Sequence, residues 1–415
     1  IEQELHLQDH CTGIDDFGER DTFPFEERTF LVQAIRALST HSFEQAERII
    51  VRHGATVWVE RGENQVRWNS LNTALVLLRK IAMIKKQPLP IDLSRLFEQY
   101  SSTFHDTDRL YREFEETIAG FFDTDGVLDA TIEQCRKAYS EYTDALGNVW
   151  FNALTSAGWP VDGQISAINT FTNNIKPLLL QHGNRVAYIF VDALRYELGA
   201  EWTRIFTQKW PTECTAVCAA LPSITSVGMS ALLPEAELKL KIVKDGEKMR
   251  PKHGGLFTDT PQDRMQVFKQ YYGDRVMEYV LDKFLERKQP LSDSVQLLIL
   301  RTQDVDDSFE SNPGLAFGQI NNVLKKIRLA LHRLQEGGFR TAYIVADHGF
   351  FLRLHPSIGD VCTKPSGTWI NLHDRMLLGE GSTNSQNVVL SAEKLGIRGD
   401  FSLAAFPQSM AAYSR

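Results

Sequence analysis

The sequence predicts an α/β fold with a mostly parallel sheet flanked by helices, preceded by an all-helical domain. Apolar residues recur at helical spacing over residues 1–183, and from residue 184 short apolar strands alternate with helices. A strand, a helix that stops at a glycine pair and a second strand follow one another between residues 295 and 346, which is typical of a βαβ unit. We therefore expect a helical domain or arm at 1–183 and an α/β domain at 184–415.

The helical part consists of segments whose apolar residues mark one buried face. We expect Ser42 to be an N-cap, and the region after residue 92 to form either two helices or one helix with a bend near His105. Residues 158–184 are interpreted as a linker region. The predicted helical segments are 29–38, 42–51, 71–84, 93–122 and 128–154.

The second part contains short apolar runs that are interpreted as strands. The helix before the fourth run has an apolar face from Ile320 to Leu334 and ends at Gly337 and Gly338. Since a helix joins the third and fourth runs, these two strands are expected to be parallel. The predicted strands are 186–191, 214–220, 295–300, 341–346 and 388–390.

Composition points to an ordinary globular protein, with 43% hydrophobic and 24% charged residues. A net charge of -8 argues against a generally basic, nucleic-acid-coating surface. The five cysteines are scattered and imply no disulfide framework. No apolar run approaches the length of a membrane span and no signal peptide opens the chain, so we expect a cytoplasmic protein without membrane contact.

Two buried strands are expected to end in side chains that bind metals. Asp192 stops the run 186–191, and Asp347 and His348 stop the run 341–346. Carboxylates and an imidazole at the carboxyl edge of one sheet suit a Zn or Mn site. The alternatives are that Asp192 only caps a helix, and that Asp347 and His348 form a turn with a buried histidine.

Two further clusters follow predicted strands. Thr225 comes after the run 214–220, near the start of a helix, where the helix field favours an alkoxide, so it is a candidate nucleophile. Ser223 and Thr225 could instead serve only as helix caps. An acidic loop after residue 300 contains Asp306 and Glu310. Its crowded carboxylates either bind a cation or face solvent in an ordinary surface loop.

Basic residues gather between Lys239 and Lys252 around the turn residues Asp245 and Gly246, which predicts a β-hairpin. Its lysines could steer a phosphate group or a nucleic acid, or the stretch could be a solvated surface hairpin. Together, an aspartate, a threonine, an acidic loop and an Asp-His pair in this order suit a two-metal phosphoryl-transfer site.

These motifs resemble the alkaline-phosphatase superfamily, and within it the PglZ family of BREX phage-defence systems. The resemblance covers residues 184–400 and is softer at Phe104–Arg112 in the helical part. The motifs that carry it are Val191-Asp-Ala-Leu-Arg-Tyr-Glu197, Pro222-Ser-Ile-Thr-Ser-Val-Gly-Met229 and Ala346-Asp-His-Gly-Phe350.

The resemblance implies an alkaline-phosphatase-like catalytic domain at 184–415 that binds up to two divalent metal ions, zinc first, with manganese or magnesium as alternatives. Thr225 would be the nucleophile and a ligand of the first ion, together with Asp192, Asp347 and His348. Asp306 would ligate the second ion.

The sequence departs from the superfamily pattern in two places. Glu310 stands where superfamily phosphodiesterases place a second-site histidine, which shifts that site toward harder ions. A His-Gly-Gly string expected near the end of the domain is missing, so the resemblance implies a domain that is incomplete at its C-terminal end. His373 is a stand-in for that histidine, and His253 is out of order for the role.

The function hypothesis is a metal-dependent phosphoesterase of the phosphodiesterase or nuclease type that acts in BREX bacteriophage defence with other BREX proteins. The substrate would be a phosphoester or a nucleic acid, with a phosphomonoester as the second choice, and Arg195, Lys244 and Lys248 are the candidate substrate-binding residues. The alternative is a non-catalytic or weakly catalytic scaffold or regulator in a defence complex, docked through its helical part. A signalling effector ranks last.

Overall fold

The chain divides into two compact units, which are described separately. Unit 1 comprises residues 1–89 and 103–146, and unit 2 comprises 90–102 and 147–415. The domain boundary expected at residue 184 stays a prediction. The computed structural model describes residues 3–11, 14, 17, 22–54, 56–60, 62–121, 123–302, 313–352, 361–373, 375–408 and 411–413.

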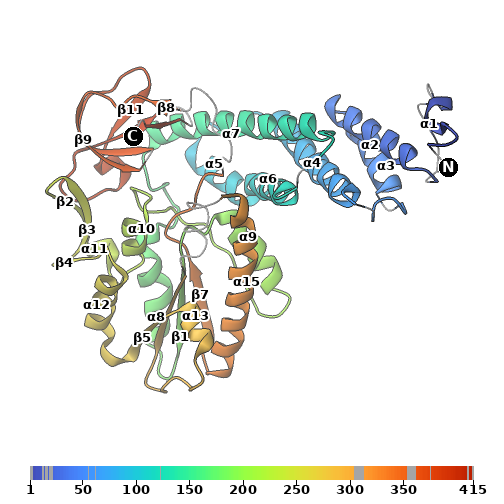
Figure 1. Ribbon diagram of the computed structural model, residues 1–415. Helices are drawn as coiled ribbons and strands as arrows, with labels where there is room; N and C mark the ends of the chain where they lie inside the picture. Colours follow the sequence, from blue (N-terminus) through green and yellow to red (C-terminus); the bar gives the residue numbers. More distant parts are fainter. Residues whose placement is uncertain are drawn as a thin grey trace. The chain divides into compact units, whose positions relative to one another are not determined.

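Unit 1 is helical, as the apolar spacing predicts (Figure 1). Helix α2 packs against α3, and α4 packs against α6. Leu71 and Leu77 of α4 and Phe114 of α6 are completely buried, which explains the apolar faces read from the sequence. The elements are α1 (Leu7–His10), α2 (Pro24–Ser39), α3 (Phe43–His53), α4 (Asn64–Lys85), α6 (His105–Ile118) and the first part of α7 (Asp129–Ala157).

The region after residue 92 is helical, and its helix type changes partway along. Helix α5 (Leu93–Gln99) ends in a π-helical turn, η1 (Tyr100–Phe104), and α6 starts at His105. A π-turn carries one extra residue per turn and so changes which side chains face the same way. Of the two expectations, the structure has one continuous helical stretch, which changes its helix type just before His105. Ser42 precedes α3 as its N-cap residue, but its side chain makes no capping hydrogen bond.

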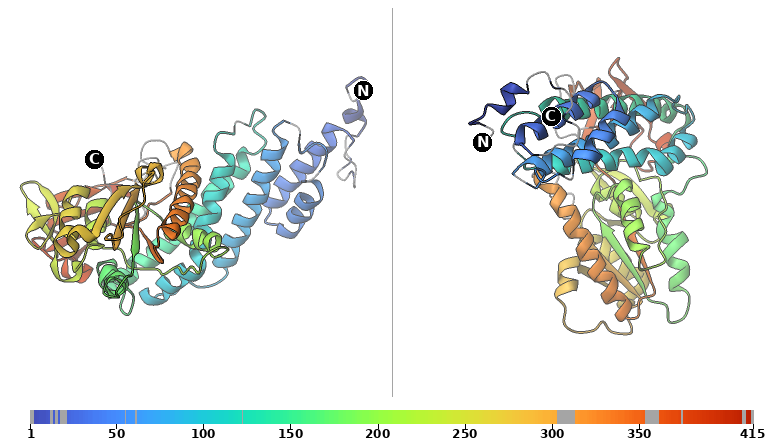
Figure 2. Two further views of the ribbon diagram at one scale, coloured as in Figure 1. Left: turned by 90° about the horizontal axis from the view of Figure 1, so that it is seen from below. Right: turned by 90° about the vertical axis from the view of Figure 1, so that its right-hand side faces the viewer.

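Unit 2 is built on a four-stranded parallel sheet with strand order β5-β6-β1-β7. Helix α15 (Pro313–Glu336) joins β6 to β7, which confirms the predicted βαβ unit. Helices α8 and α15 lie on opposite sides of this sheet (Figures 1 and 2). The strands are β1 (Val186–Val191), β5 (Val276–Val280), β6 (Leu297–Thr302) and β7 (Thr341–Val345).

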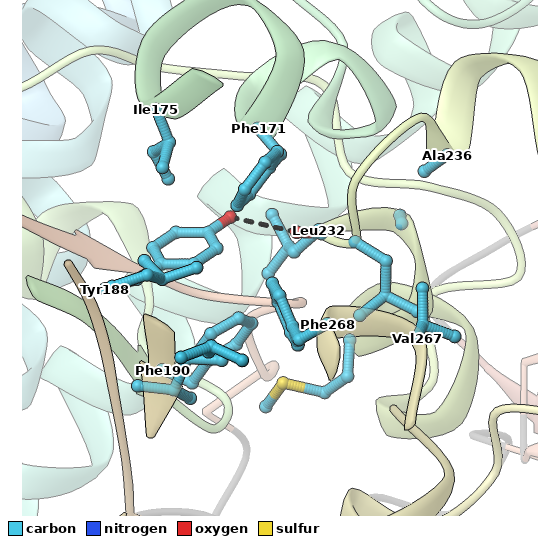
Figure 3. Packing of buried hydrophobic residues seen from close by; sticks show 14 of the residues in the cluster. Phe171, Ile175, Tyr188, Phe190, Leu232, Ala236, Val267 and Phe268 are labelled. Carbon is cyan, nitrogen blue, oxygen red and sulfur yellow. Dashed lines mark hydrogen bonds between the residues drawn. The ribbon is translucent and has the colours of Figure 1, made fainter. Parts of the chain in front are cut away.

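One face of the sheet carries an aromatic core. Tyr188 and Phe190 of β1 pack with Phe171 and Phe268 (Figure 3). The Tyr188 hydroxyl is buried and donates a hydrogen bond to the Leu232 carbonyl oxygen, at 3.2 Å. Since successive side chains of a strand point to opposite faces, the residues between these aromatics face the other layer of helices. The helices of this unit include η3 (Phe171–Ile175), α8 (Lys176–Leu179), α9 (Tyr196–Phe206), α10 (Thr225–Ala231), α12 (Pro261–Tyr272) and α13 (Leu281–Glu286).

One predicted strand is absent, and another forms but belongs to a different sheet from the one expected. Residues 214–220 form no strand, because their backbone pairs only at Cys218, through a bridge to Ser166. The run 388–390 lies in β11 (Asn387–Ser391), which belongs to a separate antiparallel sheet of order β11-β12-β10-β9. Apolar character cannot tell which partner a short strand will find. The other strands of that sheet are β12 (Leu403–Pro407), β10 (Met376–Gly381) and β9 (Gly367–His373), and β8 (Val361–Cys362) pairs with β13 (Ala412–Tyr413).

The predicted basic hairpin is confirmed. Strands β2 (Leu240–Asp245) and β3 (Lys248–His253) are antiparallel, and β4 (Leu256–Phe257) extends them. Gly246 has a φ of 64°, a left-handed conformation that glycine adopts without strain in a tight turn. In the part of the chain that the structure describes, no helix combines the length and the apolar character needed to cross a lipid bilayer.

Candidate active site at the carboxyl edge of the sheet

Asp192 leaves the end of β1 with its side chain buried, at 1% relative exposure. Its backbone N–H donates to the Thr302 carbonyl oxygen of β6, at 3.1 Å, which fixes the strand end. The next residue, Ala193, has a φ of 55°, and a left-handed alanine is a strained conformation that marks many functional sites. Helix α9 begins only at Tyr196, so the structure does not support the alternative in which Asp192 caps that helix.

Asp347 and His348 follow β7 and reach the same point. The Asp347 carboxylate is 1% exposed, and its Oδ1 accepts a hydrogen bond from the Ala193 N–H at 3.1 Å. The strained Ala193 therefore serves to orient Asp347 through its backbone amide. Asp192 and Asp347 come from neighbouring strands, β1 and β7, whose parallel pairing brings their carboxyl ends together.

The tautomer of His348 follows from its neighbours. Its Nδ1 lies 2.9 Å from the Gly349 carbonyl oxygen, and since a carbonyl oxygen only accepts hydrogen bonds, Nδ1 must carry the proton. Nε2 is then left with a lone pair that points into the site. This is the arrangement in which a histidine binds a metal through one nitrogen while the other nitrogen is held in place.

Thr225 is the first residue of α10, and its hydroxyl faces both strand ends. Thr225 Oγ1 lies 3.1 Å from His348 Nε2 and 3.4 Å from Asp192 Oδ1. Ile224 is the N-cap residue of α10, and no side chain caps this helix end. The alternative in which Ser223 or Thr225 acts only as a cap is therefore wrong, because the Thr225 hydroxyl turns toward the carboxylates instead.

The four side chains form a set of donors that fits a metal ion. One donor atom each from Asp192, Asp347 and His348 lie within 4.8 Å of one another. His348 Nε2 is 3.3 Å from Asp347 Oδ2 and 3.8 Å from Asp192 Oδ1. Asp347 Oδ2 is buried and has no hydrogen-bond partner among the described residues. Two buried carboxylates and an imidazole lone pair repel one another unless a cation lies between them, and this O,O,N set suits zinc or manganese.

A close contact between α10 and β7 holds Thr225 in range. A Cβ added to Gly228 would lie 2.6 Å from the Asp347 carbonyl oxygen and 2.7 Å from the Asp347 Cβ. Only glycine permits this approach, because any side chain would push α10 away from the strand end. The glycine of the Pro-Ser-x-Thr-x-x-Gly-Met string therefore has a geometric purpose that the sequence alone did not indicate.

The other predicted residues are placed as follows. Arg195 is buried, with its guanidinium carbon 5.1 Å from the centre of the Phe350 ring and its Nε 3.9 Å from Glu197 Oε1. Lys244 and Lys248 are exposed on the hairpin, and neither ammonium group has an acidic partner in the part of the chain that the structure describes.

Three predictions about the second metal site are untested. Asp306 and Glu310 lie outside the described residues, and for His373 only the backbone, in β9, is described. The exclusion of His253 agrees with its surroundings, because it is buried in β3 and its Nε2 lies 2.7 Å from the Pro234 carbonyl oxygen. Burial lowers the pKa of this histidine, as expected for a neutral structural imidazole.

Two arginines beside Asp192 were missed by the sequence reasoning. Arg264 of α12 and Arg301 of β6 line a pocket that also includes Asp192 and Glu278. Arg301 directly follows the apolar run 295–300. A charged side chain at the end of a strand is a sequence signal for a binding site at that edge of the sheet. Arg264 gave no comparable signal, since it reaches the pocket from a helix distant in sequence.

Comparison with known proteins adds a family and two curated relatives. A family model described as the BREX system PglZ alkaline phosphatase-like domain matches residues 170–411. The alkaline phosphatase-like protein PglZ of Bacillus cereus (strain H3081.97) is 24% identical over 371 residues, which cover 84% of this chain and 42% of that protein. The alkaline phosphatase-like protein BrxZ of Escherichia coli O9:H4 (strain HS) is 26% identical over 324 residues, which cover 69% of this chain and 35% of that protein.

The chain spans less than half the length of these curated relatives. The family match nevertheless covers more than half of this chain, and it contains the aspartates, the threonine and the histidine that meet at the sheet edge. The chain therefore belongs to the PglZ family of alkaline phosphatase-like proteins of BREX systems.

Proposed function

We propose that this protein is a metal-dependent phosphoesterase of the phosphodiesterase or nuclease type that uses Thr225 as its nucleophile. The observation that carries this proposal is the position of the Thr225 hydroxyl, 3.1 Å from His348 Nε2 and 3.4 Å from Asp192 Oδ1. A hydroxyl beside a buried carboxylate and imidazole cluster is placed for attack on phosphorus, and the buried Asp347 Oδ2 accepts no hydrogen bond within the described residues.

Asp192, Asp347 and His348 would hold one divalent ion, with Thr225 as a further oxygen donor. Such an ion would lower the pKa of the Thr225 hydroxyl and would partly neutralise the negative charge of the phosphoryl oxygens. Zinc is our first choice because the set mixes two carboxylates with an imidazole, and manganese and magnesium are the alternatives. A second ion at Asp306 and Glu310 remains part of the proposal through the family resemblance.

The chain's own groups then act in a defined order. Thr225 Oγ forms a bond to phosphorus, its proton passes to solvent, and the bond from phosphorus to the leaving oxygen breaks. Water afterwards hydrolyses the ester formed on Thr225 and regenerates the hydroxyl. Asp347 stays fixed throughout, because the Ala193 N–H holds its Oδ1. Gly349 fixes the His348 ring in the same way, through its carbonyl oxygen.

The substrate we favour is a phosphodiester in a nucleic acid. Lys244 and Lys248 present exposed ammonium groups on a hairpin whose strand β3 packs against α10, the helix that carries Thr225. Arg195 of the Asp192 motif packs against Phe350 of the Asp347 motif, where its guanidinium could contact a phosphoryl oxygen. We further propose that the protein acts in BREX phage defence and associates with other BREX proteins, in line with its family.

The test is hydrolysis of bis(p-nitrophenyl) phosphate with zinc, manganese or magnesium. Thr225→Ala should lose activity by a factor of about 10³ or more, because no other group replaces the nucleophile. Ser223→Ala is the matched control, since Ser223 is an exposed hydroxyl of the same segment with no hydrogen bond in the described part of the chain, and it should keep wild-type activity.

Two results would decide against the proposal. Hydrolysis by Thr225→Ala at the wild-type rate would remove Thr225 from the mechanism. If elemental analysis finds stoichiometric metal but the protein hydrolyses neither this phosphodiester nor DNA, the result favours the alternative in which the protein is a scaffold or regulator of a defence complex.

A further inference from the structure

A pocket lies beside Asp192 at the carboxyl ends of β1, β6 and β5, next to the first turn of α12. Its floor is apolar and includes Phe190 and Phe268, which belong to the aromatic core of Figure 3. Among the described residues, its wall carries two cationic side chains, Arg264 and Arg301. Thr225, Asp347 and His348 do not line it, so the pocket adjoins the metal-binding cluster only through Asp192.

Both guanidinium groups are anchored and still have N–H groups to donate. Arg301 Nε donates to Glu278 Oε1 at 3.0 Å, and its terminal Nη groups have no partner among the described residues. Arg264 Nη1 donates to the carbonyl oxygens of Thr258, at 3.2 Å, and Asp259, at 2.9 Å. Within the same described part, Arg264 Nε and Nη2 make no hydrogen bond. Half-buried N–H donors that are held in place and left unused are what a bound oxyanion requires.

The charges around the pocket are mixed, because its two guanidinium groups lie beside the Asp192 and Glu278 carboxylates. Burial lowers the pKa of Arg264, and the nearby Arg301 charge acts in the same direction, whereas the Asp192 carboxylate acts against it. The two arginines therefore lie close enough to repel each other, and Glu278 is the carboxylate bonded to one of them. Arginine keeps its charge under these conditions, so the pair favours an anion of tetrahedral, many-oxygen form.

We propose that this pocket binds a phosphoryl group of the substrate that neighbours the one attacked by Thr225, an inference that rests on the proposed function. Thr225 does not line the pocket, so the attacked phosphorus lies outside it. The pocket is lined by Ile299, Arg301 and Thr302 of β6, one strand beyond β1, and neighbouring strands are about 4.8 Å apart. That offset suits the next phosphate along a polynucleotide. The substrate class is therefore a nucleic acid strand, and an isolated phosphodiester leaves the pocket empty.

The experiment compares three ligands: a thymidine dinucleotide without a terminal phosphate, its 5′-phosphorylated form and its 3′-phosphorylated form. Binding to the whole chain is measured by calorimetry with metal chelated, so that nothing is turned over. One phosphorylated form should bind about 10- to 100-fold more tightly than the unphosphorylated dinucleotide, as expected for hydrogen bonds from charged donors. Arg301→Gln and Arg264→Gln should each bring that ratio close to one.

The controls separate binding from folding. Arg275→Gln removes an exposed arginine that contacts Gln296 and Tyr272, outside the pocket, and should leave the ratio unchanged. Because Arg301→Gln leaves Glu278 without its partner, the double variant Arg301→Gln/Glu278→Gln is also measured. It should unfold at the wild-type temperature and still lack the preference.

Equal affinity of wild-type protein for all three dinucleotides would overturn the subsite, as would a preference that survives Arg301→Gln. Inorganic phosphate is added as a competitor to identify the source of the oxyanion. It should weaken binding of the preferred dinucleotide and leave binding of the unphosphorylated one unchanged. If phosphate competes with neither dinucleotide, the proposed role of the pocket is also contradicted. Failure of the proposed function is seen elsewhere, as absent hydrolysis of bis(p-nitrophenyl) phosphate, which carries one phosphoryl group and does not depend on this pocket.

Discussion

Gly228 of α10 and Asp347 at the end of β7 are in such close contact that a Cβ at position 228 would lie 2.6 Å from the Asp347 carbonyl oxygen. This contact holds α10, and with it the candidate nucleophile three residues earlier on the same helix, against the strand end that carries Asp347 and His348. The position of the Thr225 hydroxyl relative to the candidate metal ligands therefore depends on this backbone approach.

Gly228→Ala should accordingly impair both stability and metal binding. Alanine normally stabilises a helix by about 1 kcal/mol relative to glycine, but here the clash with backbone atoms should lower the free energy of unfolding by roughly 1–3 kcal/mol. Denaturant unfolding and zinc titration measure the two effects. Gly318→Ala in α15 is the matched control, because its Cβ would meet no atom within 4 Å, and it should be neutral or stabilising. A Gly228→Ala variant as stable as wild type would contradict the geometry.

Asp347→Asn tests the metal site without breaking the strand-end contact. The asparagine Oδ1 can still accept from the Ala193 N–H, while the charge at the position of Oδ2 is lost. Zinc affinity should fall at least about 10- to 100-fold, and the rise in melting temperature on adding zinc should disappear. Elemental analysis and thermal unfolding with and without zinc measure this. Asp293→Asn, at an exposed carboxylate, is the control, and full zinc occupancy in Asp347→Asn would rule out this ligand set.

The strand ends of this site could be predicted because each combines two simple signals. In β1 and β7, an apolar run, buried in β1 and half-buried in β7, is followed by a charged or imidazole side chain, and parallel pairing then brings both ends to one edge. The cluster of Asp192, Asp347 and His348 follows from that rule. The run 214–220 is as apolar as a strand but forms only one bridge, because strand formation depends on a partner that local sequence does not specify.

The place of Arg264 in the arginine pocket was beyond sequence reasoning for a related reason. Arg264 sits on α12 with its guanidinium held by the carbonyl oxygens of Thr258 and Asp259, just before that helix. Nothing in its spacing distinguishes it from a solvated helical arginine. Its place beside Asp192 results from how α12 packs on the sheet, which is a tertiary relationship. The left-handed Ala193 was equally hidden, since alanine gives no sign of such a backbone conformation.

In unit 1, the pair Arg67 and Asp123 should make stability depend on pH. Burial by itself raises the pKa of Asp123, but the hydrogen bond from the Leu128 N–H and the Arg67 guanidinium outweigh it and leave the pKa below its ordinary value. A lowered carboxyl pKa adds stability that is present above the unfolded-state value of about 3.9 and is lost as the pH falls through the lower folded-state value.

Asp123→Asn should therefore lower the free energy of unfolding by about 1–3 kcal/mol at pH 7, and the difference from wild type should shrink as the pH falls below about 4. Denaturant unfolding across this pH range is the measurement. Asp125→Asn is the control, because Asp125 lies 3.5 Å from the same guanidinium but is half exposed, and it should have a smaller effect. A penalty that stayed constant down to the acid limit would show that the charge of Asp123 is not responsible.

The last prediction concerns the basic hairpin, whose lysines lie on strands β2 and β3. Arg250 is bound by Asp245 and Asp259, whereas Lys244 and Lys248 have no acidic partner in the described ranges. If both contact phosphates, Lys244→Gln/Lys248→Gln should weaken DNA binding and reduce the slope of log affinity against log salt by about 1.4–1.8. Fluorescence anisotropy at several salt concentrations measures the slope. Lys283→Gln/Lys288→Gln removes the same charge from exposed positions around α13 and should leave the slope unchanged. Equal slopes for the hairpin variant and wild type would exclude the hairpin from the nucleic-acid interface.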